Sequence, residues 1–236
     1  MRVLLKISGE ALQWNREHWI DPSFLEELAL NIKEIHERNI EIAIVLGWGN
    51  IFRWVAGAAN WIDRTAADYM GMLATIMNWV AMQDALEKAW IETRLVSALD
   101  IPEIWEKYIK RRSERHLEKW RIVISVAWTW NPYFTTDSAW VLRGLELSCD
   151  MVIKATKVDW VFDKDPMKFK DAKLIKRASF MDVISKDIKV MDHTAITLAK
   201  EGNLTLKVVN LYKKWAILRA ILWEEEGTTI SIKKDI

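Results

Sequence analysis

Short apolar runs rich in β-branched residues alternate with segments of helical period along this chain, and this alternation restricts its fold more than any other feature. Val3–Ile7 and Ile40–Leu46 are two such runs, and the segment between them carries apolar residues at 25, 28, 29, 32 and 35. A strand that is apolar along its whole length is buried on both faces, which is typical of parallel sheets covered by helices. The sequence therefore predicts an α/β fold, a three-layer sandwich with a mainly parallel central sheet.

The same patterns predict the remaining elements. Asp21-Pro22-Ser23 is typical of a helix start, and it precedes a helix over residues 24–38. Residues 163–179 are polar and without a clear period, which predicts a hairpin or loop. No repeat, low-complexity tract or linker divides the chain, so we expect a single domain over residues 1–236. Further strands are predicted at 93–98, 122–127, 151–155, 205–209 and 228–232, and helices at 66–89, 111–119, 136–149, 193–201 and 216–223.

Composition argues against several classes of protein. A net charge of +1 gives no electrostatic reason to expect nucleic acid or an anionic membrane as a partner. The N-terminal residues lack the apolar core of a secretion signal, and no apolar run approaches the roughly 20 residues that span a bilayer. Cys149 is the only cysteine, which excludes an internal disulfide. We therefore expect a cytoplasmic protein.

Four segments that follow predicted strands carry the chemistry, because ligands bind beyond the carboxyl ends of parallel strands. Lys6 and Gly9 offer a cation and a turn whose N–H groups can face a phosphate. Gly47-Trp48-Gly49-Asn50 with Arg53 is similar to a phosphate-cradling strand-to-helix turn, although the chain has no Walker A motif. Taken alone, each of these two segments also fits an ordinary structural turn.

The other two segments lie in the second half of the chain. Residues 129–137 are rich in hydroxyl and amide groups and open a helix, so Thr135, Thr136 and Asp137 can cap it and its N–H groups can meet an anion. Residues 154–166 offer carboxylates and an aromatic ring, which fit either a nucleotide site or a charged surface loop. The histidines at 18, 36, 116 and 193 show no metal-ligand spacing, and Cys149 fits the core better than a nucleophile.

Together these motifs resemble those of bacterial uridylate kinases, which have the amino acid kinase fold. The resemblance implies transfer of the γ-phosphoryl group of ATP to UMP with Mg²⁺, giving UDP and ADP in pyrimidine nucleotide biosynthesis. It also implies a homohexamer that GTP activates and UTP inhibits. The resemblance rests, in chain order, on LLKISGEAL (4–12), ID (20–21), VLGWGNIFRW (45–54), DYMGMLATIMN (68–78), AMQDAL (81–86), WTWNPYFTTD (128–137), KATKVDWVFDKDP (154–166), VMD with TAITLA (190–199) and EEGTTI (225–230).

The resemblance also implies the site residues. It assigns catalytic roles to Lys6, Arg53 and Asp137, with Asp137 near the metal or the transferred phosphoryl group. It does not identify the metal ligands. UMP's phosphate is itself the attacking group and is already ionised, so cations and N–H groups matter more than a general base. The implied ATP contacts are Lys6, Ile7, Ser8, Gly9, Gly49, Arg53, Thr156, Phe162 and Asp165. The implied UMP contacts are Trp48, Asp68, Thr129, Trp130, Asn131, Pro132, Tyr133, Phe134, Thr135 and Thr136.

One departure from the family is systematic, because thirteen of the fifteen tryptophans stand where the family has glycine. Several of these positions are expected to need φ > 0 or a close backbone approach, which tryptophan disfavours. We hypothesise that UGA codons read as glycine in the source were translated as tryptophan; deliberate replacement is the other origin considered. Taken literally, the indoles at 48, 128 and 130 would fill the nucleotide site and favour a non-catalytic nucleotide-binding or regulatory protein. The thirteen are Trp14, Trp19, Trp48, Trp54, Trp61, Trp79, Trp90, Trp120, Trp128, Trp130, Trp160, Trp215 and Trp223.

Overall fold

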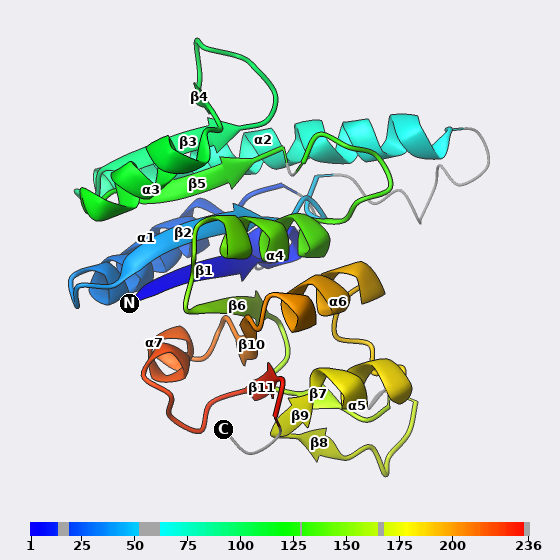
Figure 1. The fold of residues 1–236 in the computed structure, drawn as a ribbon. Coiled ribbons are helices and arrows are strands. Elements are labelled where there is room, and N and C mark those ends of the chain that lie inside the picture. The colour runs from blue at the N-terminus through cyan, green and yellow to red at the C-terminus, as the bar shows by residue number, and fades with distance from the viewer. Residues whose placement is uncertain (14–18, 52–61, 128, 165–167, 234–236) are drawn as a thin grey trace.

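A nine-stranded sheet forms the centre of the structure, a computed structural model that describes residues 1–13, 19–51, 62–127, 129–164 and 168–233 (Figure 1). The strand order is β4-β3-β5-β2-β1-β6-β10-β11-β9, and within these described ranges every pairing in this sheet is parallel except that of β10 with β11. The predicted mainly parallel α/β sheet is confirmed. The strands are β1 Arg2–Ile7, β2 Glu41–Leu46, β3 Thr93–Ser97, β4 Glu106–Lys107, β5 Ile122–Val126, β6 Met151–Thr156, β9 Arg177–Ser179, β10 Thr205–Asn210 and β11 Thr228–Ser231.

Helices cover both faces of this sheet and complete the predicted three layers. Helices α1 and α2 pack together behind the sheet in Figure 1, and α3, α4 and α6 lie in front of it. Strands β1 and β2 run through the middle, and both are buried from their second residue onward. The helices are the short 3₁₀ turn η1 Gly9–Gln13, α1 Pro22–His36, α2 Arg64–Lys88, α3 Lys110–Glu118, α4 Thr136–Glu146, α5 Phe180–Ser185, α6 His193–Glu201 and α7 Ala216–Ile221.

Local sequence accounts for where several of these elements begin and end. The Asp21 carboxylate accepts the backbone N–H groups of Ser23 and Phe24, so it caps α1 as predicted. Helix α4 ends at Glu146 rather than at Cys149, and Cys149 lies buried in the connection that follows. The segment predicted as a hairpin or loop, residues 163–179, contains β8 Leu174–Ile175, which pairs antiparallel with β7 Val161–Phe162 just before the segment; its last three residues form β9 of the main sheet.

No helix in the described ranges is both long and apolar enough to cross a membrane.

Candidate active site

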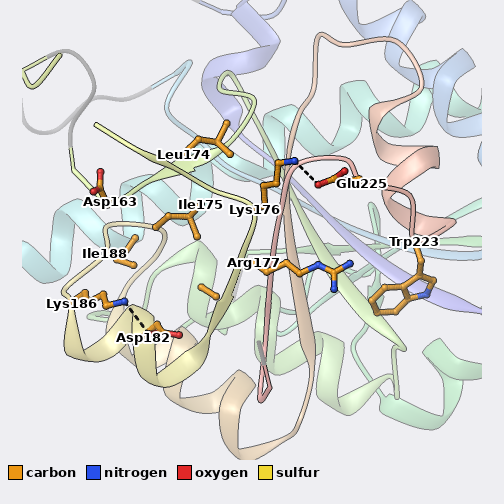
Figure 2. Close-up of a pocket in the computed structure, with 11 residues that line it drawn as sticks. Asp163, Leu174, Ile175, Lys176, Arg177, Asp182, Lys186, Ile188, Trp223 and Glu225 are labelled. Atoms are coloured by element: carbon orange, nitrogen blue, oxygen red, sulfur yellow. Dashed lines mark hydrogen bonds and ion pairs between the residues drawn. The ribbon is translucent and has the colours of Figure 1, made fainter. Parts of the chain in front are cut away.

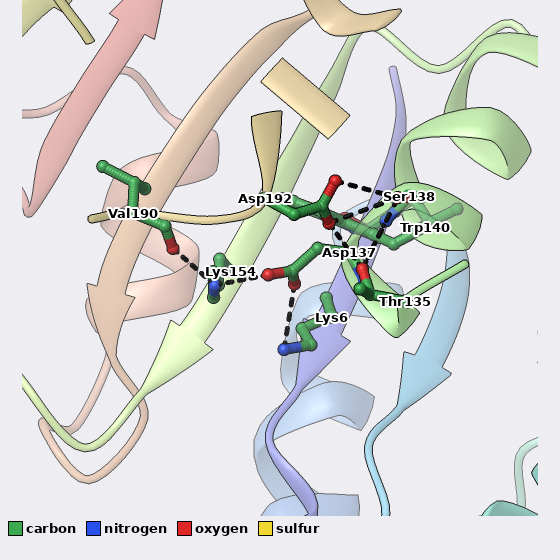
Figure 3. A network of polar contacts seen from close by, with 9 residues as sticks. Lys6, Thr135, Asp137, Ser138, Trp140, Lys154, Val190 and Asp192 are labelled. Atoms are coloured by element: carbon green, nitrogen blue, oxygen red, sulfur yellow. Dashed lines mark hydrogen bonds and ion pairs between the residues drawn. The ribbon is translucent and has the colours of Figure 1, made fainter. Parts of the chain in front are cut away.

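Two lysines from neighbouring central strands meet one aspartate at the carboxyl edge of the sheet. Lys6 of β1 and Lys154 of β6 are partners in the parallel register, so their side chains leave the sheet at the same level. Asp137, in the first turn of α4, lies between them (Figure 3). Its Oδ1 is 3.1 Å from Lys6 Nζ, and its Oδ2 accepts a 2.8 Å hydrogen bond from Lys154 Nζ. The topology thus brings together two of the predicted catalytic residues, Lys6 and Asp137.

The electrostatics of this cluster favour an anionic ligand. Burial by itself would raise the pKa of Asp137, but the charges of Lys6 and Lys154 outweigh it and hold that pKa at about 2. Burial, and then repulsion from Lys6, lowers the pKa of Lys154, and the Asp137 carboxylate offsets only part of this. Oδ1 of Asp137 receives no well-directed hydrogen bond, so Lys6 acts on it as a charge. Lys6 and Lys154 both face Asp137, and a second carboxylate, Asp192, acts on Lys154 as well, so the two ammonium groups are the positive ends that a phosphate can meet here.

A second carboxylate, Asp192, fixes the helix that carries Asp137. Thr135 caps α4 by accepting the N–H groups of Asp137 and Ser138, and its hydroxyl donates to Asp192. The Ser138 hydroxyl also donates to Asp192, at 3.0 Å from Oδ1. Asp192 caps α6 as well, by accepting the N–H of Ala195. The first turns of α4 and α6 are therefore joined through one side chain.

The turns after β1 and β2 approach each other so closely that only glycine fits. A Cβ atom on Gly9 would lie 2.6 Å from the backbone of Gly47, and the Gly47 N–H donates to the Ile7 carbonyl at 2.9 Å. The turn after β2 is held by Asn78 of α2, whose amide donates to the Gly47 carbonyl and exchanges hydrogen bonds with the Asn50 side chain. Ser8, Gly9 and Gly49 consequently lie on two adjoining turns beside Lys6, and Ile7 is the last residue of β1.

Residues 129–136, predicted to hold UMP, form the loop that leads into α4. Asn131 turns back on Thr129 through two 3.3 Å hydrogen bonds, and Pro132 lies in the turn that follows. The N–H of Tyr133 donates to the Asp68 carboxylate at 2.8 Å, which ties this loop to the first turns of α2. The side chains of Tyr133 and Phe134 are exposed, and Thr136 is the first residue of α4. Asp68 thus lies beside the rest of the predicted acceptor site.

A cavity of about 560 Å³ adjoins the lysine cluster at Lys154. Lys154, Thr156 and Phe162 line it, together with Val190, whose carbonyl accepts from Lys154 Nζ at 2.6 Å. Its volume falls within the usual range for small-molecule sites. Two of the residues predicted to contact ATP, Thr156 and Phe162, are therefore walls of one cavity that leads to the cluster.

A larger cavity of about 990 Å³ lies beyond the β7–β8 hairpin (Figure 2). Leu174, Arg177 and Trp223 line it, along with the ion pairs Lys176–Glu225 and Lys186–Asp182. It contains none of the predicted nucleotide contacts and does not reach Lys154. The larger of the two cavities is therefore not the one that adjoins the lysine cluster.

The predicted site residues Arg53 and Asp165 lie outside the described residues, as do the tryptophans at 14, 54, 61 and 128. Over the part of the chain that the structure describes, no group of three or more His, Cys, Asp or Glu side chains is arranged to hold a metal ion. Lys154, Ser138 and Asp192 were not predicted as site residues. Lys154 does follow the pattern of a polar residue near a strand end, but nothing in the sequence links Asp192 to a loop 57 residues earlier.

Comparison with known proteins agrees with this geometry. The model of the amino acid kinase family matches residues 1–210. A UMP kinase from Bacillus anthracis superimposes with a TM-score of 0.95 and 35% sequence identity, covering 98% of this chain and 96% of the other. A UMP kinase from Ureaplasma parvum gives a TM-score of 0.91 at 33% identity, with 98% of both chains covered. A uridylate kinase from Archaeoglobus fulgidus shares the fold at a TM-score of 0.74 and 23% identity, covering 98% of this chain and 100% of the other.

Proposed function

The chain belongs to the amino acid kinase family and is a phosphotransferase, and on this premise we propose that it transfers the γ-phosphoryl group of ATP to UMP. The products are UDP and ADP, and the reaction belongs to pyrimidine nucleotide biosynthesis in the cytoplasm. The observation that carries the proposal is the Lys6–Asp137–Lys154 cluster, which lies between the 560 Å³ cavity and the loop over residues 129–136.

The reaction needs charge stabilisation more than acid–base chemistry. An oxygen of the UMP phosphate attacks the γ-phosphorus, and the bond from that phosphorus to the bridging oxygen of ADP breaks. Lys6 and Lys154 are placed to face the phosphoryl oxygens, and Asp137 holds both ammonium groups in position. The N–H groups at the start of α4 add a further positive end at the same place.

ATP is used with Mg²⁺, which neutralises the phosphate charge and orients the donor when bound. Mg²⁺ usually keeps several waters and is held by one or two carboxylates together with substrate phosphates. The residues fit this mode, because Asp137 is a buried carboxylate with an oxygen that lacks a directed hydrogen bond. Asp137 is therefore the residue that we assign to the metal. Assembly into a homohexamer, activation by GTP and inhibition by UTP are predictions that rest on the resemblance alone.

A specific observation supports a second candidate, a non-catalytic nucleotide-binding protein. The indoles of Trp48 and Trp130 pack together with Met72 and Ala139 beside the proposed acceptor loop. A chain with these indoles in place can keep its donor cavity without accepting UMP.

A coupled assay of ATP-dependent phosphoryl transfer separates the two candidates. UMP, CMP, AMP and GMP are offered to this chain and to a variant with glycine at the thirteen family-glycine positions. We expect the glycine variant to be active and selective for UMP, and Asp137→Asn in that variant to lower kcat by roughly 10²-fold or more. A glycine variant that folds and binds ATP but phosphorylates none of the four acceptors would leave the binding protein as the correct assignment.

A further inference from the structure

Two tryptophans form a small apolar cluster of their own, separate from the main core. Trp48, in the turn after β2, and Trp130, in the loop before α4, both pack against Met72 of α2 and Ala139 of α4. The Trp130 ring also lies 5.2 Å from the ring of Tyr69, centroid to centroid. The Trp48 indole lies against the backbone of α2, because a Cβ atom on Gly71 would be only 3.1 Å from its Cε2.

This cluster borders the groups assigned to the acceptor nucleotide. Asp68 is next to Tyr69 on α2, and its carboxylate accepts the Tyr133 N–H from the acceptor loop. Ala139 follows Ser138, whose N–H is capped by Thr135 at the start of α4. The two indoles therefore lie between the first turns of α2 and α4, beside both Asp68 and the loop.

The backbone at these positions suits a smaller residue. Trp130 has φ of 59°, a left-handed conformation that glycine and asparagine adopt readily and tryptophan does not. The Trp48 indole fits against α2 because Gly71 has no side chain. A glycine at 48 would leave this part of the α2 surface uncovered. The donor cavity is different, because neither of these two indoles lines it, and it keeps a volume of about 560 Å³ although Trp160, another of the thirteen, is one of its walls.

We propose that the indoles of Trp48 and Trp130 close the acceptor subsite and leave the donor cavity open, so that this chain binds ATP but excludes the nucleoside monophosphate. The inference rests on the proposed function, which supplies the identity of the acceptor. Glycine at both positions reopens the space beside Asp68 to a pyrimidine nucleotide.

Calorimetric titration of Mg·ATP and, separately, of UMP tests this closure. The background is the full chain with W90G, W120G, W215G and W223G, which relieve left-handed tryptophans that are at least 37% exposed and lie outside the cluster. One site variant adds W48G/W130G, and a second adds W48A/W130N, since asparagine tolerates the left-handed backbone at 130. We expect UMP to bind at least tenfold more tightly to both site variants than to the background, while the Kd for Mg·ATP changes less than threefold.

The results also separate this inference from the proposed function. Equal UMP affinity in the background and in both site variants overturns the closure, and so does a gain that appears only when W128G is added. A gain for AMP or GMP in place of UMP supports the closure and contradicts UMP as the acceptor. Absence of Mg·ATP binding in every variant contradicts both the proposed kinase and the open donor cavity, and the change in UMP affinity still decides whether the indoles close the acceptor subsite.

Discussion

At the scale of single residues, the tryptophans fall into two groups with different physical properties. Of the nine described tryptophans at family-glycine positions, six have a left-handed backbone and a seventh, Trp79, buries its indole N–H without an acceptor. Trp105 and Trp140, which do not replace a family glycine, are buried and donate their indole N–H groups to the carbonyls of Leu99 and Leu4. The six with a left-handed backbone are Trp19, Trp90, Trp120, Trp130, Trp215 and Trp223.

This contrast agrees with the hypothesis that glycine is the residue of the working protein at the thirteen positions. The left-handed conformation costs a residue with a Cβ atom roughly 1–2 kcal/mol, and six such costs are comparable to the whole stability of a typical domain. UGG codons at these six positions in the gene would contradict the hypothesis, because UGG encodes tryptophan under either reading of UGA.

Replacing a left-handed, exposed tryptophan with glycine is expected to stabilise the chain. Trp90 is 91% exposed with φ of 66°, so W90G removes strain and sacrifices almost no packing. Glycine also adds conformational entropy to the unfolded chain, which offsets part of the gain, so we expect the free energy of unfolding to rise by about 0.5–1 kcal/mol. Urea-induced unfolding measures this change in free energy. The matched control W140G empties a fully buried site in α4 and should lower the free energy of unfolding by about 4 kcal/mol or more. A lower free energy of unfolding in W90G than in the parent would contradict the argument.

At the scale of elements, the sequence predicted the long strands and helices well and the short ones poorly. Strands β1, β2, β5 and β6 are buried on both faces, so their apolar runs were unambiguous. Strand β4 has two residues, too few to display a period, and α5 was missed as well, although α7, which also has six residues, was predicted. The site shows the same limit. Lys6 and Asp137 belong to motifs that can be recognised locally, but Asp192 acquires its role only when α6 is packed against α4.

The ion pairs that Asp137 of α4 makes with Lys6 of β1 and Lys154 of β6 should stabilise the fold less in acid. The pKa of Asp137 is about 2 in the folded chain, below its ordinary value of 3.8, so the ionised form favours folding above about pH 4 and this contribution disappears as the pH falls toward 2. We expect the difference in unfolding free energy between the parent and Asp137→Asn to shrink by about 2 kcal/mol between pH 5 and pH 2. In Lys154→Met the decline should begin at higher pH, since one of the two cations is missing. A difference that stays constant over this range would show that the lysines do not stabilise the carboxylate.

At the scale of the whole molecule, one short hairpin separates two cavities that differ in what they can bind. Phe162 of β7 lines the smaller cavity, and its partner in register, Leu174 of β8, lines the larger one. Of these two cavities, the smaller one reaches Lys154, and its lining has two aromatic side chains, Trp160 and Phe162, on which a base can stack. The larger one is bordered by lysine–carboxylate pairs that already satisfy each other's charge.

If the smaller cavity is the donor site, Mg·ATP should stabilise the whole chain through Phe162 and not through Leu174. At 100 times its Kd a ligand adds about 2.7 kcal/mol, which for a chain of this length raises Tm by roughly 5–10 °C. Base stacking on an aromatic ring is worth about 1–3 kcal/mol, so Phe162→Ala should remove between about a third and nearly all of this rise at the same ATP concentration. Leu174→Ala perturbs the same hairpin from its other strand and should leave the rise within about 2 °C of the parent. Differential scanning fluorimetry with and without Mg·ATP gives both values, and a rise that depends on Leu174 instead would move the donor site to the larger cavity.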